Sequence, residues 1–349
     1  MHDHDLTPGS GPVLVTGGSG YLGSHVVDAL LRAGHRVRTT VRSPDRADGV
    51  RATAARAGAD PGERLDVVQA DLASDEGWAE AVKGSEYVLH VASPFPARQP
   101  RTEDEVVVPA RDGALRVLRA ARDHGVRRVV LTSSFAAVGY SRTGGGAYDE
   151  SDWTDPADDL TPYIKSKAVA ERAAWDFMAA EGGELELAVI NPPGIFGPVL
   201  DRHLSASVLL VKAMLEGALP VVPPLYFDVA DVRDVARAHL RAMTEPGAAG
   251  ERFLIGGGTA TSLHGMARVL AEGLGERAAK VPARELTPEE VREGARTDPA
   301  LREAASQLGR VPVLRTDKAR AVLGWAPRAV RTTVLDTAES LFRLGLVEA

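Results

Sequence analysis

The feature that most constrains the fold is a glycine-rich turn near the start of the chain, between a short apolar strand and a helix. The apolar run at 13–15 leads into Thr-Gly-Gly-Ser-Gly-Tyr-Leu-Gly at 16–23, and apolar residues with helical spacing continue to position 33. Glycine permits a tight bend here and lets backbone N–H groups approach a pyrophosphate at the helix N-terminus. Because a strand precedes the turn and a helix follows it, we predict a dinucleotide-binding loop and not an empty structural turn. The glycines with the required spacing are Gly17, Gly20 and Gly23.

The chain up to Asn191 alternates between short β-branched segments and longer helical ones. This alternation is typical of an α/β protein with a doubly wound parallel sheet, the Rossmann arrangement. Pro109 predicts that the helix containing it starts or kinks there. The predicted strands are 36–41, 65–69, 87–91, 128–132 and 186–190, and the predicted helices are 103–124 and 162–181.

The character of the sequence changes after Asn191, where prolines are frequent and the strand pattern is lost. We therefore predict a dinucleotide-binding Rossmann domain over 12–190. A smaller, mostly helical lobe over 191–349 would bind the substrate, with some of its segments returning to the sheet domain. Further helices are expected at 287–307, 316–323 and 332–344.

The composition narrows the classes of partner and compartment. The 349 residues carry a net charge of -7 and no cysteine. A negative overall field disfavours nucleic acid as a partner, and the lack of cysteine excludes disulfides and thiolate chemistry. No apolar run reaches the length of a bilayer span, and the polar first residues lack the apolar core of a signal peptide. We expect a cytoplasmic protein without a metal site, a nucleic-acid partner or a membrane segment.

The end of the second predicted strand indicates which dinucleotide binds. NAD enzymes usually place Asp or Glu there, against the ribose hydroxyls. This chain instead has Arg-Thr-Thr-Val-Arg at 38–42. A guanidinium group suits a 2′-phosphate, so we predict NADPH over NADH. Arg42 is the stronger candidate for the phosphate contact and Arg38 is the weaker one.

A tyrosine, a lysine and a pair of serines predict the chemistry. Tyr163 and Lys167 lie one helical turn apart, so their side chains share one face of the predicted helix. Hydride transfer to a carbonyl leaves an alkoxide that needs a proton, and a nearby ammonium group makes a phenol a better proton donor. Ser133 and Ser134 follow the strand at 128–132, and one of their hydroxyls can hold the substrate oxygen near Tyr163. The alternative, a surface Tyr–Lys pair on an exposed helix, is disfavoured by the glycine loop.

Together these motifs resemble the extended short-chain dehydrogenases/reductases, and most closely the dihydroflavonol-4-reductase-like branch, which includes aldehyde and ketone reductases. The resemblance also covers the segments 191–198, 228–236 and 323–325. It implies that Ser134, and not Ser133, is catalytic. It further implies that Asp71 lies beside the adenine, although an aspartate at a strand end is as often a helix cap. Besides Arg42 and the three glycines, the implied cofactor contacts are Ser19, Tyr21, Leu22, Asp71, Leu72, Val91, Ala92, Ser93, Tyr163, Lys167, Pro192, Ile195 and Ser207.

Aromatic residues near these motifs predict the class of substrate. If they converge, they form a largely apolar pocket that suits a hydrophobic aldehyde or ketone; they can equally belong to the core. Plant flavonoid enzymes of the resembling branch carry Asn at the position of Gly139, which argues against dihydroflavonol as the substrate. The residues expected around the carbonyl are Phe95, Phe135, Tyr140, Phe196, Tyr226 and Phe227.

The sequence therefore predicts an NADPH-dependent reductase of a hydrophobic aldehyde or ketone, with Tyr163 as proton donor, Lys167 assisting it and Ser134 orienting the carbonyl. One alternative is a nucleotide-sugar epimerase or dehydratase with tightly bound NAD, in which Arg202 and Arg233 would bind a diphosphate. A second alternative is a non-catalytic dinucleotide-sensing protein, in which the catalytic residues would be eroded. The resemblance implies a monomer or a homodimer.

Overall fold

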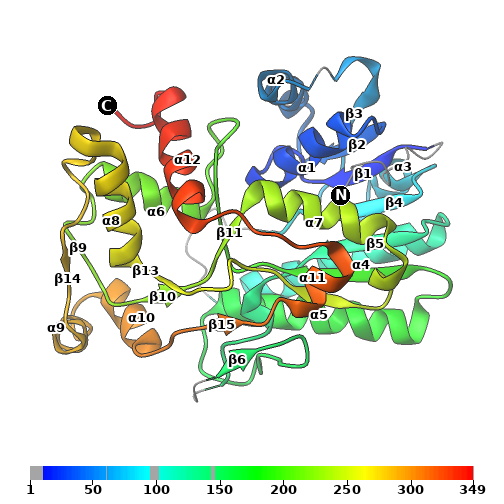
Figure 1. The fold of residues 1–349 in the computed structure, drawn as a ribbon. Coiled ribbons are helices and arrows are strands. Elements are labelled where there is room, and N and C mark those ends of the chain that lie inside the picture. The colour runs from blue at the N-terminus through cyan, green and yellow to red at the C-terminus, as the bar shows by residue number, and fades with distance from the viewer. Residues whose placement is uncertain (1–10, 60, 95–101, 143–145, 349) are drawn as a thin grey trace.

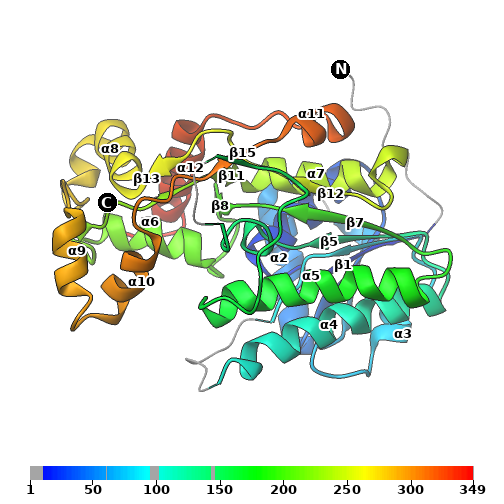
Figure 2. The ribbon, with the colours of Figure 1, turned by 90° about the horizontal axis from the view of Figure 1, so that it is seen from below.

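A parallel sheet of seven strands lies at the centre of the computed structural model, which describes residues 11–59, 61–94, 102–142 and 146–348 (Figures 1 and 2). The strand order is β12-β7-β5-β4-β1-β2-β3, which confirms the predicted Rossmann class. Because β1 pairs with both β2 and β4, the winding reverses there, at the switch point where α/β sheets bind nucleotides. The strands are β1 (Val13–Thr16), β2 (Val37–Val41), β3 (Leu65–Gln69), β4 (Tyr87–His90), β5 (Arg128–Thr132), β7 (Glu186–Asn191) and β12 (Arg252–Leu254).

Helices cover both faces of the sheet, because successive strand residues point to opposite sides. Val13 and Val15 of β1 belong to the core that contains α1 and α7, whereas Leu14 belongs to the core on the opposite face. In Figure 2, α4 and α5 run along one face and α7 lies across the other. The helices of these layers are α1 (Tyr21–Arg32), α7 (Val232–Thr244), α3 (Trp78–Val82), α4 (Asp104–Asp123) and α5 (Pro162–Glu181).

Most elements begin and end close to the predicted positions. The predicted segments 65–69, 128–132 and 162–181 match β3, β5 and α5 at both ends. The helix expected at 103–124 is α4, which begins at Asp104 and continues through Pro109, so it does not start at that proline. A proline in the second turn removes one backbone hydrogen bond. Val107 and Ala110, before and after this proline, are buried, and this packing maintains the helix.

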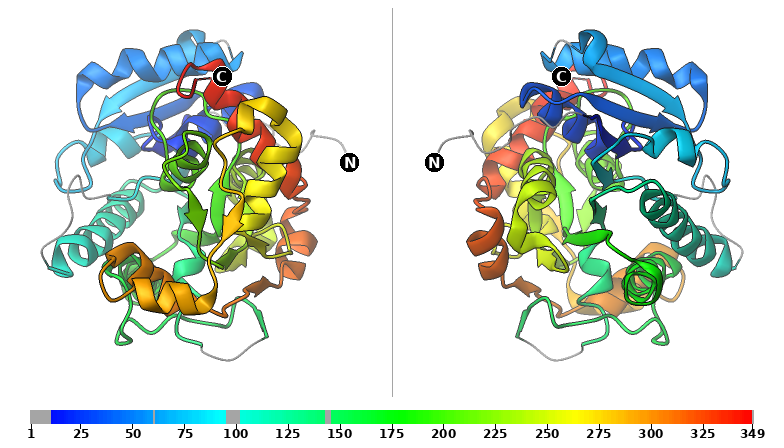
Figure 3. Two further views of the ribbon diagram at one scale, coloured as in Figure 1. Left: turned by 90° about the vertical axis from the view of Figure 1, so that its left-hand side faces the viewer. Right: turned by 90° about the vertical axis from the view of Figure 1, so that its right-hand side faces the viewer.

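After Asn191 much of the chain packs at one end of the sheet, at the left of Figure 1 and nearest the viewer in the left-hand view of Figure 3, and part of it returns to the sheet. β12 extends the sheet beside β7, and α7 and α11 pack near it. Of the remaining helices, α2 (Ala47–Ala57) packs against α1 and β3. The others are α6 (Ala206–Leu215), α8 (Leu263–Leu274), α9 (Pro288–Gly294), α10 (Pro299–Gln307), α11 (Asp317–Leu323) and α12 (Val330–Arg343). The short strands pair as β6 (Ala147–Tyr148) with β15 (Val313–Leu314), β8 (Gly194–Phe196) with β11 (Val229–Asp231), β9 (Val221–Val222) with β14 (Arg284–Glu285) and β10 (Tyr226–Phe227) with β13 (Thr261–Ser262).

Within the part of the chain that the structure describes, no helix is both long enough and apolar enough to cross a membrane.

Candidate active site

The glycine loop joins β1 to α1 at the switch point of the sheet. Gly17 has a φ of 72°, and its carbonyl oxygen accepts a hydrogen bond of 2.9 Å from the Gly20 N–H. A Cβ atom on Gly23 would lie 2.2 Å from that carbonyl oxygen, so a side chain at this position would collide with the turn. Among the described residues, no side chain caps the N-terminus of α1. Its first N–H groups are therefore available to an anion, and the loop fits a dinucleotide pyrophosphate.

The remaining predicted residues of the loop differ in what they present to a cofactor. Ser19 is half-buried, and Tyr21 and Leu22 are buried. The Tyr21 hydroxyl donates a hydrogen bond of 2.9 Å to the Gly197 carbonyl, which ties α1 to the segment after β8. Burial raises the pKa of this phenol well above its usual value, so it stays protonated. Because the side chains of Tyr21 and Leu22 are buried, these residues can bind an anion through their backbone N–H groups.

Two threonines of β2, whose role was not predicted from the sequence, hold the glycine loop. The Oγ1 atom of Thr39 accepts a hydrogen bond of 3.0 Å from the Gly18 N–H, and Oγ1 of Thr40 accepts one of 3.1 Å from the Gly17 N–H. Both threonines are buried. Buried hydroxyl groups are almost always hydrogen-bonded, so two adjacent threonines in a strand next to the glycine loop were the signal that could have revealed this role.

The two arginines in and directly after β2 differ in their contacts. Arg38 donates hydrogen bonds to the Asp66 carboxylate at 2.9 Å and to the Lys83 carbonyl at 2.8 Å, so its guanidinium holds neighbouring segments together. Arg42 follows β2 and is exposed, and its guanidinium has no hydrogen-bond or ion-pair partner among the described residues. Arg42 is therefore the arginine that is free to contact a 2′-phosphate.

The segments after β3 and β4 border the same end of the sheet. Asp71 accepts a hydrogen bond of 3.0 Å from the Ala73 N–H, which makes its carboxylate a cap of the turn after β3. Leu72 and Ala92 line a cavity at this end of the sheet. The Oγ1 atom of Thr16 accepts the Ala92 N–H at 2.9 Å and fixes the backbone after β4 beside the glycine loop. Val91 is half-buried in the same segment.

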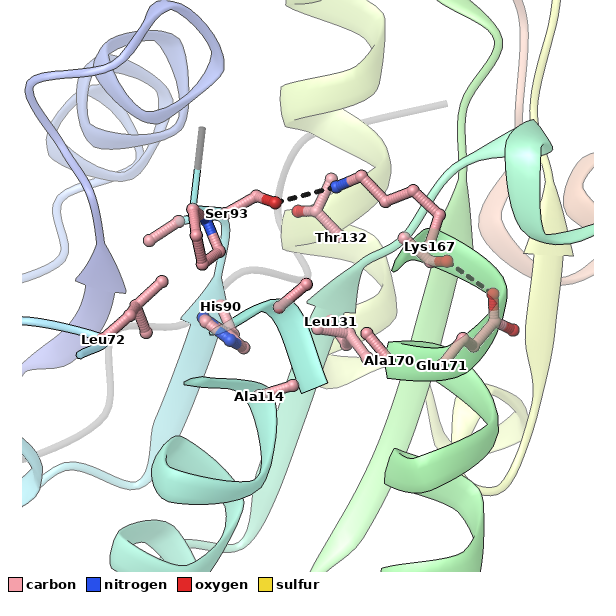
Figure 4. A pocket seen from close by; sticks show the side chains of 13 residues that line it. Leu72, His90, Ser93, Ala114, Leu131, Thr132, Lys167, Ala170 and Glu171 are labelled. Carbon is pink, nitrogen blue, oxygen red and sulfur yellow. Dashed lines mark hydrogen bonds between the residues drawn. The ribbon is translucent and has the colours of Figure 1, made fainter. Parts of the chain in front are cut away.

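Tyr163 and Lys167 lie on one face of α5 and meet the segment after β4. The helix starts with Pro162, a residue suited to the first turn because it lacks an N–H group. Nζ of Lys167 lies 5.7 Å from the centroid of the Tyr163 ring. It donates a hydrogen bond of 3.0 Å to Oγ of Ser93 (Figure 4). The Tyr163 side chain is 48% exposed. The ammonium group is thus held between the phenol and the switch point of the sheet.

The structure gives the two serines after β5 different roles. Oγ of Ser134 accepts a hydrogen bond of 3.0 Å from the Ala136 N–H, at the start of the short helix η4 (Phe135–Ala137). No acceptor for the Ser134 proton occurs among the residues described, so this hydroxyl can donate to a substrate oxygen. Ser133 is buried, and its hydroxyl donates to Glu171 in the interior.

The cavity that Leu72 and Ala92 line is small and lies under Lys167, between the ends of β4 and β5 and the helices α4 and α5 (Figure 4). His90 lines it, and its Nδ1 atom hydrogen-bonds with Oγ1 of Thr16 at 2.8 Å. Burial, together with the nearby Lys167 ammonium, lowers the pKa of His90 to about 3. This histidine is therefore neutral at physiological pH and is not poised to donate a proton.

His239 of α7 is also buried beside the site. Its Nδ1 atom lies 2.8 Å from the Val235 carbonyl, which accepts the ring proton. Its Nε2 atom therefore accepts the Thr132 hydroxyl, at 2.6 Å. Burial lowers the pKa of His239 to about 4. The residue joins α7 to the end of β5.

Two of the predicted substrate residues belong to the core in this structure. Phe135 is 8% exposed and packs edge-on against Tyr148, with ring centroids 5.2 Å apart. Phe196 is 2% exposed and stacks on Phe227, with centroids 5.8 Å apart. Of the two readings of these residues, pocket or core, the structure favours the core for both side chains.

Other predicted contacts lie nearer to solvent. Tyr140 is half-buried, and Tyr226 on β10 is 40% exposed. Burial raises the pKa of the Tyr140 phenol, and the neighbouring Tyr163 adds to the increase. Phe95 lies outside the described residues.

The predicted cofactor contacts after Asn191 come from three places. Pro192 is buried directly after β7, and its carbonyl accepts the Phe135 N–H at 2.8 Å. Ile195 is half-buried in β8, and Ser207 is half-buried in the first turn of α6.

Comparison with known proteins assigns the family. A family model described as the NAD dependent epimerase/dehydratase family matches residues 13–256. The chain belongs to this family. The match includes the glycine loop, Ser134, Tyr163 and Lys167.

Several proteins to which the chain is similar are reductases. The chain is 36% identical to cinnamoyl-CoA reductase CAD2 of Medicago truncatula over 250 residues, which is 70% of this chain and 75% of that protein. It is 34% identical to dihydroflavonol 4-reductase of Zea mays over 272 residues, 75% of this chain and 74% of that one. The structure of a yeast methylglyoxal/isovaleraldehyde reductase complexed with NADPH superposes with a TM-score of 0.78 at 26% identity, covering 96% of this chain and 100% of the other.

The described residues of this family member hold no group of three or more histidines and carboxylates that could bind a metal ion.

Proposed function

We propose that this protein is an NADPH-dependent reductase that converts an apolar aldehyde or ketone to the alcohol. The observation that carries the proposal is the contact of Lys167 with both the Tyr163 ring and the Ser93 hydroxyl. It holds a proton donor and its activating ammonium at the switch point, next to the glycine loop.

The residues divide the chemistry between them. NADPH bound in the glycine loop would supply a hydride to the carbonyl carbon. Ser134 donates a hydrogen bond to the carbonyl oxygen, because its own proton has no acceptor in the described structure. Tyr163 then gives its proton to the oxygen as the alkoxide forms, and Lys167 stabilises the phenolate that remains. Bulk water reprotonates Tyr163, whose side chain is 48% exposed.

The residues around the glycine loop favour NADPH over NADH. The end of β2 carries no carboxylate to meet the ribose hydroxyls, and Arg42 is exposed there without a partner among the described residues. The related yeast reductase was solved with NADPH. Arg42 would pair with the 2′-phosphate.

The names of the related reductases support a carbonyl substrate. Among the predicted aromatic residues, Tyr140 and Tyr226 remain candidates to line the pocket. A Cβ atom on Gly139 would lie 2.1 Å from the ring of Phe135, and that ring is buried. The asparagine that plant flavonoid enzymes carry at this position would therefore displace the ring, which argues against a dihydroflavonol substrate.

The nucleotide-sugar alternative loses one of its two candidate arginines. Arg233 donates to both oxygens of Asp231, at 2.8 and 2.7 Å, and to Asp336 at 2.7 Å. A guanidinium with two carboxylates already bound is poorly placed to neutralise a diphosphate. Arg202 is exposed and remains as a single candidate.

The proposal is tested with purified protein, NADPH or NADH, and a panel of aromatic, aliphatic and diketone carbonyls, by following the loss of reduced cofactor. We expect turnover with NADPH, and we expect Tyr163→Phe to lose at least about 10²-fold in kcat while still binding NADPH. A protein that retains NAD through purification and reduces no carbonyl would be an epimerase or dehydratase. Binding of NADPH without turnover of any carbonyl would support a sensing role.

A further inference from the structure

A buried carboxylate contacts the elements that carry the catalytic residues. Glu171 lies on α5 one turn after Lys167, and its side chain is 0% exposed. Its Oε2 atom accepts hydrogen bonds from the Ser133 hydroxyl and, at 2.6 Å, from Nδ2 of Asn191. These two donors come from the ends of β5 and β7, so one oxygen atom of α5 holds the ends of two neighbouring strands.

The two donors also bracket Ser134. Ser133 precedes it in the chain, and Nδ2 of Asn191 donates its second hydrogen bond, of 3.2 Å, to the Ser134 carbonyl. The Ser133 N–H further binds the Ile190 carbonyl at 2.8 Å, which fixes the backbone between β5 and β7. The position of Ser134 therefore depends on groups that are themselves bound to Glu171.

The other oxygen of Glu171 faces a buried cation. Its Oε1 atom lies 2.7 Å from Nε of Arg252 on β12, whose side chain is 8% exposed. The Arg252 guanidinium stacks on Trp153 at 3.6 Å and donates to the Asp152 carbonyl at 3.0 Å. A buried carboxylate paired with one cation and bound by three further donors, with Trp175 as the third, is held in a single orientation.

We propose that Glu171 is a positioning residue that sets the Ser134 hydroxyl against Tyr163 and Lys167, an inference that rests on the proposed reductase function. Tyr163, Lys167 and Glu171 share one rigid helix, so the bonds from Glu171 to Ser133 and Asn191 fix the spacing between that helix and the end of β5. Ser134 and Tyr163 must direct their protons at the same substrate oxygen. A misplacement of about 1 Å between such groups can lower the rate by about 10²-fold.

A double-mutant cycle separates this role from general structural support. The variants are Glu171→Gln, Ser134→Ala and the combination, each measured for kcat, for KM of the carbonyl and for NADPH binding. We expect Glu171→Gln to lower kcat by about ten- to a hundredfold with little change in NADPH binding. In the Ser134→Ala background it should lower kcat further by less than about twofold, because the hydroxyl that it positions is absent. An equal loss in both backgrounds, or no loss in either, would overturn the proposal.

A milder variant covers the case in which Glu171→Gln fails to fold because Arg252 loses its partner. Ser133→Ala removes one donor and leaves the Glu171–Arg252 pair intact. We expect it to lower kcat several-fold when Ser134 is present and not when Ser134 is alanine. Ser340→Ala is a matched control, since Ser340 is a buried serine that binds only backbone groups near α12; it should lower stability and leave kcat unchanged.

The failure of this inference differs from the failure of the proposed function. If the wild type reduces no carbonyl, the reductase function is wrong and the inference is wrong with it. If the wild type turns over and the cycles show no dependence on Ser134, only the role of Glu171 is wrong.

Discussion

A single methyl group at position 23 is enough to test the cofactor loop. Gly23→Ala would place a Cβ atom 2.2 Å from the Gly17 carbonyl oxygen and 3.0 Å from the Gly18 Cα atom, both of which are backbone atoms of the turn. The turn must open to accommodate it, so we expect NADPH affinity to fall by at least about tenfold, the equivalent of about 1.4 kcal/mol. The measurement is a titration that follows the fluorescence of NADPH.

The matched control for this substitution lies in α2. A Cβ atom on Gly49 would meet nothing within 4 Å. Gly49→Ala should therefore leave NADPH affinity unchanged and stabilise the fold by about 0.4–1 kcal/mol. If Gly23→Ala binds NADPH as the wild type does, the loop is not the pyrophosphate site.

We also expect a single residue, Arg42, to decide the choice between the two nicotinamide dinucleotides. Arg42 is exposed and has no partner among the described residues, so its removal should leave the fold intact. We expect Arg42→Ala to raise KM for NADPH by about ten- to a hundredfold, the value of a charge-assisted hydrogen bond of about 1.5–3 kcal/mol. KM for NADH should hardly change, because NADH lacks the 2′-phosphate. Equal losses for both cofactors would show that Arg42 does not contact this phosphate.

At the scale of helices and strands, local periodicity was enough to predict most of the sheet domain. The apolar runs of β3 and β5 and the helical period of α5 gave both ends of each element. The seventh strand, β12, was missed because it has three residues, too few for a period. Pairing with β7 makes it a strand, and that contact joins residues far apart in the sequence.

In the candidate site, too, contacts within one element could be predicted from the sequence and contacts between distant elements could not. Tyr163 and Lys167 could be paired from the sequence because four residues make one helical turn. The contacts of Thr39 with Gly18 and of Glu171 with Asn191 could not be predicted from the sequence, because they depend on how distant elements align in space. Residue type also failed to distinguish core from pocket, since a buried phenylalanine such as Phe196 serves packing as well as it would serve a substrate.

At the scale of the whole molecule, a neutral histidine is one of the contacts that join helix α7 to the sheet. His239 of α7 accepts the Thr132 hydroxyl at the end of β5, and burial lowers its pKa from 6.5 to about 4. His90 of β4 behaves in the same way, with a pKa of about 3. The unfolded chain therefore binds protons on these two side chains at a higher pH than the folded protein does. Their contribution to the free energy of unfolding is complete above pH 6.5 and is lost as the pH falls toward 4 and below.

We therefore expect the free energy of unfolding to decrease between pH 6.5 and about 4, with His239 responsible for up to about 1.4 kcal/mol per pH unit in the middle of this range. His239→Asn should be less stable than the wild type at pH 7, because the Thr132 hydroxyl loses its acceptor, but its stability should depend less steeply on pH. Urea unfolding at several pH values measures both effects. An unchanged slope in His239→Asn would mean that this histidine takes up its proton without unfolding, and that the contact between α7 and β5 does not require the neutral ring.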